Sequence, residues 1–316
     1  MASRILFNLL QVIVVIGFSP LAAGVLSRLK EIIQSKRGPS VLQPYRDLQK
    51  LFRKDQVISQ RASWIFQATP YVVFVTPILV TLLIPVLTAY PLFFAFMGDM
   101  LGVGFILALG GFFATLAAVT TANPYGSMGA SRTRMVGFLT EPVFMIVFFT
   151  VSFVAGSTIP YIVQKYWVTP FTNFFEPSHV LLVLAFLMLI LAEMGRIPVD
   201  NPSGHFELAM IDEAKALEYS GSGAALIKWG GYMKMFVLMC IFLNVVVTPW
   251  GLASGTTFLD VLLAIPLVLL KILALVLALV VIESSLAKLR LFRISEFLGS
   301  AFITSVAAMI MQFVKT

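Results

Sequence analysis

Long apolar runs separated by short polar segments make up most of this sequence. The runs are 18 to 26 residues long, the length that an α-helix needs to cross the roughly 30 Å hydrocarbon core of a bilayer. This pattern predicts an all-α, polytopic membrane protein with eight transmembrane helices in a single membrane domain covering residues 1–316. We expect the spans near residues 5–27, 65–90, 100–122, 135–156, 178–195, 232–250, 258–283 and 297–314.

The composition supports the same class of protein. Hydrophobic residues make up 59% of the chain and charged residues 12%, whereas a soluble domain contains about 25% charged residues. The single cysteine, Cys240, excludes an internal disulfide and an iron–sulfur cluster, because such clusters usually need four thiolates. The sequence also lacks a phosphate-binding loop motif and a nucleophile–base pair. We therefore expect no metal, no cofactor and no catalytic centre in this chain.

The basic residues are concentrated in alternate connections between the predicted spans. The odd-numbered connections hold 17 of the 22 lysines and arginines, and the even-numbered connections hold only Lys165. Because lysine and arginine are retained on the cytoplasmic side, we expect the odd-numbered connections to be cytoplasmic and both termini to face outward. The net charge of +7 then indicates contact with anionic lipid or partner subunits rather than nucleic acid.

The first connection contains an amphipathic stretch at residues 43–54, where Pro44 suits a first helical turn. One side of the predicted helix carries Tyr45, Leu48, Leu51 and Phe52. Two interpretations remain open: a helix lying on the membrane surface, and a docking surface for a cytoplasmic partner. The candidate docking residues are Arg37, Arg46, Asp47, Lys50, Arg53 and Lys54.

Two ionisable residues lie deep within predicted spans, where charge is costly and usually functional. Glu141 directly precedes Pro142, which has no N–H and so leaves the carbonyl of Phe138 free. This arrangement favours a proton-handling carboxyl in a water-filled pocket, and the alternative is a protonated glutamate bonded to a neighbouring helix. Lys271 is predicted to relay protons, and the alternative is a buried structural ion pair.

Further acids lie at span ends and in the fifth connection. Glu193 and Arg196 stand three residues apart, where they can pair on one helix face, and we expect a structural ion pair at Arg196. Glu283 ends the seventh span. It is a candidate for the proton pathway, and the alternative is a carboxylate that is simply solvated at the membrane interface. The fifth connection is rich in apolar residues, so we expect it to fold against the bundle with its acids lining a cavity. Those acids, which are candidates for a proton pathway, are Asp200, Glu207, Asp212, Glu213 and Glu218.

Four blocks of residues, in order along the chain, resemble a known family. They are the run at 36–47 continuing to Lys50-Leu51-Phe52, the run Gly129-Ala130-Ser131-Arg132 followed by Glu141-Pro142, the acidic block from Ala192 to Gly221, and Glu283 with Leu289-Arg290-Leu291. They are similar to the eight-helix membrane subunit shared by respiratory Complex I and the membrane-bound group 4 nickel–iron hydrogenases. The run Arg37-Gly38-Pro39-Ser40 favours the hydrogenase branch of this family, which includes formate hydrogenlyase.

The resemblance implies a membrane anchor between an electron-transfer arm and a membrane arm. It implies that Glu141, Glu193, Glu207 and Glu218 belong to a chain of acids and water. Where many relatives carry acids after the loop proline, this chain has Ser203 and His205. The imidazole of His205 can shuttle protons near neutral pH, and the alternative is a solvated loop residue.

The resemblance also implies partners and cofactors. The expected partners are hydrogenase-like large and small subunits, iron–sulfur proteins, antiporter-like membrane subunits and lipid. Iron–sulfur clusters and a nickel–iron centre are expected in those partners, in a prokaryotic cytoplasmic membrane. Two alternatives remain: the quinone-site subunit of a Complex I-like dehydrogenase, and a stand-alone secondary transporter. A quinone-sized cavity between the first span, the amphipathic helix and the fifth connection would favour the former.

Overall fold

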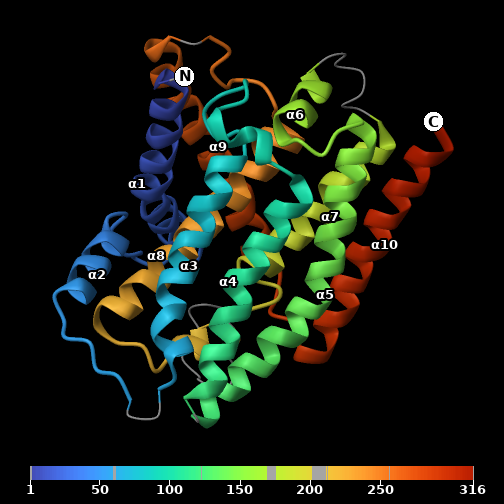
Figure 1. The fold of residues 1–316 in the computed structure, drawn as a ribbon. Helices are drawn as coiled ribbons and strands as arrows, with labels where there is room; N and C mark the ends of the chain where they lie inside the picture. Colours follow the sequence, from blue (N-terminus) through green and yellow to red (C-terminus); the bar gives the residue numbers. More distant parts are fainter. Residues whose placement is uncertain are drawn as a thin grey trace.

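The computed structural model is a bundle of helices (Figure 1). It describes residues 2–59, 62–121, 123–168, 176–200, 211, 213–255 and 257–315. Three of the predicted proton-pathway residues, His205, Glu207 and Asp212, lie outside the described residues. Within the described part of the chain, the only extended pairing is one isolated bridge, between Thr88 and Ala253.

The helices follow the predicted spans in order. They are α1 (Ala2–Ile33), α2 (Gln43–Phe52), α3 (Trp64–Leu83), α4 (Met100–Thr120), α5 (Pro124–Ala155), α6 (Pro160–Val168), α7 (Pro177–Glu193), α8 (Gly221–Cys240), α9 (Phe258–Ser285) and α10 (Leu291–Lys315). Among the described residues, seven helices are long and apolar enough to cross a membrane. The eighth expected span is α7, an apolar helix of 17 residues, which is at the lower limit of spanning length. The chain is therefore an all-α polytopic membrane protein, with seven spans of full length rather than eight.

Several helices extend past the predicted spans by more than one turn. The helices of the fourth, sixth and eighth spans begin at Pro124, Gly221 and Leu291, because polar residues assigned to loops continue the helices. The start of α5 has a local cause: the side chain of Asn123 accepts a hydrogen bond from the Tyr125 amide, and proline suits the first turn. The second span ends early, at Leu83, because Pro85 forces Ile84 into an extended conformation.

The helix α8 packs through the centre of the bundle against α1 and α3, and its residues 235–243 are all buried. Its approach to α3 depends on Gly230, since a Cβ there would lie 2.6 Å from the carbonyl oxygen of Val73. Small residues at membrane helix contacts allow such close backbone packing. Beyond Cys240, α8 continues as a π-helix, Ile241–Val247.

The bundle has two different ends. Figure 1 places both termini at one end, together with α6. This end, called here the terminal end, also holds the non-helical segments 84–92 and 248–255, which pair through Ala253 with Leu87 and Ala89 at 2.9 Å. The opposite end, called here the cavity end, holds α2, the described residues between α7 and α8 (194–200, 211 and 213–220) and the α9–α10 connection. The cytoplasmic placement of the odd-numbered connections stays a prediction.

Candidate functional site

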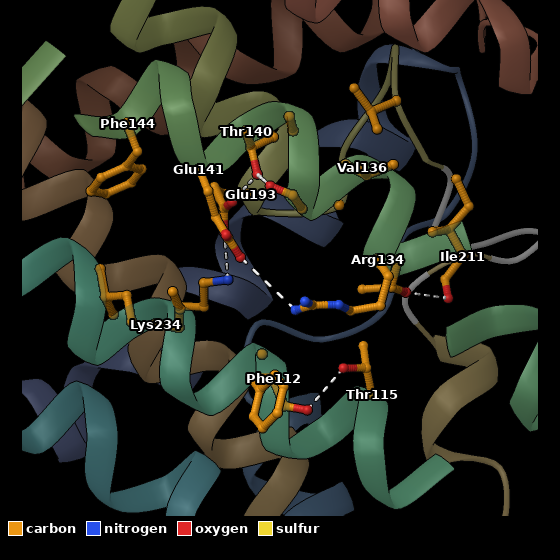
Figure 2. Close-up of a pocket in the computed structure, with 18 of the residues that line it drawn as sticks. Phe112, Thr115, Arg134, Val136, Thr140, Glu141, Phe144, Glu193, Ile211 and Lys234 are labelled. Carbon is orange, nitrogen blue, oxygen red and sulfur yellow. Dashed lines mark hydrogen bonds and ion pairs between the residues drawn. The ribbon is translucent and has the colours of Figure 1, made fainter. Parts of the chain in front are cut away.

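Two adjoining cavities lie at the cavity end. The smaller, of about 100 Å³, lies between α4, α5 and α7 and is drawn in Figure 2. The larger, of about 530 Å³, is lined by α1, α3, α4, α8 and the segment after α7, with Pro44 of α2. Seven residues line both cavities: Leu107, Gly111, Glu193, Gly195, Asp200, Lys215 and Lys234. The two cavities therefore share a wall that contains acidic and basic side chains.

Glu193 is one of two acids in this shared wall, and both of its carboxylate oxygens contact a neighbouring side chain. Its Oε1 accepts a hydrogen bond from the Thr140 hydroxyl at 2.7 Å, and its Oε2 lies 2.7 Å from Nζ of Lys234. Figure 2 shows Thr140 and Lys234 reaching this carboxylate from different helices. Glu193 is also the last residue of α7, where the helix dipole disfavours a negative charge. The Lys234 ammonium offsets this unfavourable position.

Glu141 lies in the smaller cavity in a much looser setting. Its side chain is 47% exposed, and its Oε1 lies 4.0 Å from Arg134 (Figure 2). The Arg134 guanidinium stacks over the Phe112 ring, 5.4 Å from its centre. Because Glu141 is only loosely paired, its charge can change with little structural cost.

Glu283 is buried and lies beside two cations. Its carboxylate is 1% exposed and lies 3.3 Å from Nζ of Lys30 and 3.8 Å from Nε of Arg196. The expected structural ion pair at Arg196 is therefore present, but with Glu283 rather than Glu193, because α7 ends before Arg196. Burial lowers the pKa of the Arg196 guanidinium, and the nearby Glu283 carboxylate opposes that shift. Glu283 is not a solvated residue at a span end.

Asp200 ties the segment after α7 to the α9–α10 connection. Its carboxylate is buried, accepts a hydrogen bond from the Ile211 amide at 3.1 Å and lies 2.9 Å from Nζ of Lys288. A backbone hydrogen bond from Leu289 to the carbonyl of Pro198, 2.9 Å long, joins the same two segments. The described residues Pro198, Asp200 and Ile211 are therefore held against the bundle. The apolar residues Phe206, Leu208 and Met210 lie outside the described residues, so the packing predicted from them stays a prediction.

The remaining predicted acids divide between this site and other places. Glu213 is exposed on a short 3-10 helix, Glu213–Ala216, and lines the larger cavity. Glu218 accepts a hydrogen bond from the side chain of Asn123. Lys271 is not brought together with the acids: it bonds oxygens at the terminal end. Within the described residues, no three His, Cys, Asp or Glu side chains meet as metal ligands.

The helix α2 places the candidate docking residues on the surface. Pro44 and Leu48 are buried, and α2 packs on α1 and α8, so its apolar side faces the protein. Asp47 accepts a hydrogen bond from Gln43 at 2.8 Å. The exposed basic residues are Arg37, Arg46, Lys50, Arg53 and Lys54. Their role in docking stays a prediction.

The basic partners of the buried acids were not predicted from the sequence. Lys234 binds Glu193, Lys30 lies against Glu283 and Lys288 binds Asp200. A signal existed for Lys234, because it is a single charge within the apolar run 229–247. Lys30 and Lys288 resemble ordinary loop cations in the sequence, and only packing reveals their partners.

Comparison with known proteins gives consistent matches along the chain. Residues 6–314 match the family described as NADH dehydrogenase. The chain is similar to formate hydrogenlyase subunit 4 of Escherichia coli (strain K12), with 33% identity over 289 residues, 91% of this chain and 92% of the relative. Hydrogenase-4 component C of the same organism is 31% identical, covering 90% and 88% of the two chains. An NADH-quinone oxidoreductase subunit of Rubrobacter xylanophilus is 27% identical, covering 71% and 68%.

A solved structure has a similar fold. A chain of the membrane-bound sulfane sulfur reductase, an archaeal respiratory membrane complex, superposes with a TM-score of 0.83. The match covers 98% of this chain and 99% of that one, at 20% sequence identity. This likeness is one of fold, and it extends over the whole bundle.

Proposed function

The chain belongs to the NADH dehydrogenase subunit 1 family, and we propose that it anchors and couples proton translocation in a group 4 hydrogenase or formate hydrogenlyase-like complex. The two relatives at 33% and 31% identity carry hydrogenlyase and hydrogenase names, which supports this branch of the family. The redox chemistry then takes place in partner subunits, which carry the iron–sulfur clusters and the nickel–iron centre. This chain binds those subunits through its exposed basic segment at α2 and moves protons.

The observation that carries the proposal is the position of Glu193 in the wall shared by both cavities. The carboxylate faces the charged larger cavity and the smaller cavity that contains Glu141. Its contacts, Thr140 and Lys234, stabilise the charged form. A change of charge near this wall, caused by redox chemistry in the partner arm, would change the electrostatic field at the Glu193 carboxylate. A proton taken up there is passed to Glu141 and to the adjoining membrane subunits.

The test is a Glu193→Gln variant of the assembled complex in liposomes. Hydrogen evolution reports electron transfer, and a pH-sensitive dye reports proton movement. We expect electron transfer to continue and most proton translocation to disappear, because the amide cannot exchange a proton. Glu296→Gln is the matched control, since Glu296 is exposed on α10 and lines neither cavity. Full translocation by the Glu193→Gln variant would reject the proposal. Replacing sodium with choline in the buffer shows whether the translocated ion is a proton or a sodium ion.

The branch of the family is tested by purification. We expect iron–sulfur subunits and a nickel-containing large subunit to co-purify with this chain, and metal analysis would detect the nickel. A stand-alone secondary transporter would instead purify without iron–sulfur subunits. This experiment identifies the complex without depending on the role of Glu193.

A quinone-site subunit is the second candidate, because the larger cavity lies where that alternative requires it. Its volume of about 530 Å³ falls within the range of roughly 300–1,000 Å³ for ligand pockets. Nine of its 28 lining residues are Lys, Arg, Asp or Glu, and these charged groups can hold water and protons within a cavity that is otherwise largely apolar. Reduction of a short-chain quinone by the purified complex would favour this second function.

A further inference from the structure

Lys271 lies in a cage of oxygen atoms at the terminal end. Its Nζ donates hydrogen bonds to the carbonyl of Thr248 at 2.8 Å, to Oδ1 of Asn244 at 3.4 Å and to the carbonyl of Trp250. These acceptors come from the π-helix that ends α8 and from the non-helical segment after it. A lysine on the apolar helix α9 thus binds backbone oxygens that the break in α8 leaves available.

The cage is complementary to a protonated amine. An ammonium group has three N–H donors and no acceptor, and the cage offers three acceptors. The orientation of Asn244 is fixed, because its Nδ2 donates to the carbonyls of Pro85 and Val86, each at 3.1 Å. Its oxygen therefore faces Lys271. A neutral amine would place its lone pair against oxygen atoms, which cannot donate a hydrogen bond to it.

This setting does not suit a proton relay. Among the ion pairs formed by the described residues, none includes Lys271. Carbonyl and amide oxygens do not titrate near neutral pH, so the cage offers no group to which the ammonium could pass its proton. Among the described residues, the ammonium therefore has no hydrogen-bond partner that could take its proton.

The surroundings place this charge between buried polar groups at the terminal end and the acids at the cavity end. On the terminal side, the side chains of Gln11, Tyr161 and Asn244 bond the buried residues 84–87. Asn8 is 1% exposed, and neither of its amide atoms has a hydrogen-bond partner among the described residues. Buried polar groups are therefore present on the terminal side of the bundle, the side on which the oxygens around Lys271 lie.

On the cavity side, α8 separates Lys271 from the acids. Lys234, which binds Glu193, and Asn244, which binds Lys271, are ten residues apart on this helix, or about 15 Å at 1.5 Å per residue. All side chains of residues 235–243 between them are buried and non-ionic. The ammonium thus lies between the terminal end of the bundle and the acids of the cavity end.

We propose that Lys271 is an electrostatic barrier, which prevents protons from leaking between the terminal end and the acid-lined cavities. A fixed positive charge in a narrow polar region repels protons and other cations, as in selective pores. The role goes beyond the proposed function, because it concerns the passive tightness of the subunit and not its redox coupling.

The test measures passive proton leak through the purified complex in liposomes, with no electron donor present. A potassium gradient with valinomycin drives protons, and a trapped dye reports the internal pH. Lys271→Gln keeps hydrogen-bond donors but removes the charge. We expect it to leak about tenfold faster, the factor that like charges about 12 Å apart impose at an effective dielectric constant of about 20. The Lys271→Arg variant and the exposed-site control Lys165→Gln should leak protons no faster than the wild type.

An assembled Lys271→Gln complex that is as tight as the wild type overturns the proposal. If this variant does not assemble, Lys271→Cys in a Cys240→Ala background decides instead. Aminoethylation of the new thiol restores a lysine-like cation and should restore tightness, whereas a neutral methylthio group should not. Equal leak after both modifications also overturns the proposal. Because no electron donor is present, the result does not depend on the outcome of the Glu193 experiment.

Discussion

The two ends of the bundle hold their cations in different ways. At the cavity end, Lys234 and Lys288 each contact a carboxylate, at 2.7 and 2.9 Å respectively. At the terminal end, Lys271 contacts carbonyl and amide oxygens. A carboxylate can gain a proton when its surroundings change, whereas a carbonyl oxygen cannot near neutral pH. The cavity end therefore pairs these lysines with groups that can change their charge, whereas the terminal end pairs Lys271 with groups that cannot.

The largest effect should come from removing the acid that lies against two buried cations. Glu283→Gln leaves Lys30 and Arg196 buried without their carboxylate, and we expect a loss of about 3–5 kcal/mol in the free energy of unfolding. Thermal denaturation of the detergent-solubilised protein measures the loss. The exposed Glu296→Gln variant should melt as the wild type does, and Lys30→Met combined with Glu283→Leu should recover part of the stability. An unchanged melting temperature for Glu283→Gln contradicts the structure of this cluster.

The next effect concerns the terminal end. Asn244→Leu removes the donor to the carbonyls of Pro85 and Val86 and one acceptor of Lys271. Each buried polar group left unpaired costs about 1–3 kcal/mol, so we expect a loss of about 3 kcal/mol. The same denaturation assay applies, with Gln34→Leu as the control, because Gln34 is exposed and lies just after α1. A stability equal to that of the wild type would mean that water replaces the amide, and the cage would not be rigid.

The third effect tests the helix that joins the two ends. Gly230→Ala places a Cβ 2.6 Å from the carbonyl oxygen of Val73, whereas a Cβ at the adjacent Gly231 meets no atom within 4 Å. We expect Gly230→Ala to cost about 1–3 kcal/mol through overpacking and Gly231→Ala to have little effect. Parallel melting curves of the two variants measure the difference. Equal curves would show that α8 can shift against α3.

The smallest effect on stability belongs to Glu141. Its pair with Arg134 is long and half exposed, so Glu141→Gln should change stability by less than about 1 kcal/mol. If Glu141 receives protons from Glu193, the variant should still assemble and transfer electrons while proton translocation falls. The liposome assay with an electron donor measures both. A variant that retains full translocation would remove Glu141 from the pathway.

The sequence predicted those features that depend on local composition. The apolar runs located the spans. The alternation of apolar and basic residues predicted a helix at residues 43–54, and α2 covers Gln43–Phe52. These features follow from helical periodicity and burial, which each stretch of sequence carries by itself.

The features that the sequence did not predict depend on residues distant along the chain. The spacing of Glu193 and Arg196 suggested a pair, but α7 ends at Glu193 and the two side chains bind different partners. For Lys271 the sequence named no partner, and the broken end of α8 surrounds it with oxygens. Where a helix ends or breaks decides which groups meet, and apolar periodicity does not determine that point.

The contact between Lys30 and Glu283 also has a consequence for biosynthesis. Chains are made from the N-terminus, so α1 enters the membrane carrying Lys30 long before Glu283 at the end of α9 is synthesised. Until then, Lys30 and Arg196 remain costly cations beside the membrane interior. A truncated or stalled chain retains these exposed charges, and a complete chain covers them. The cluster thus forms only after α1, Arg196 and the end of α9 have all been made and packed together.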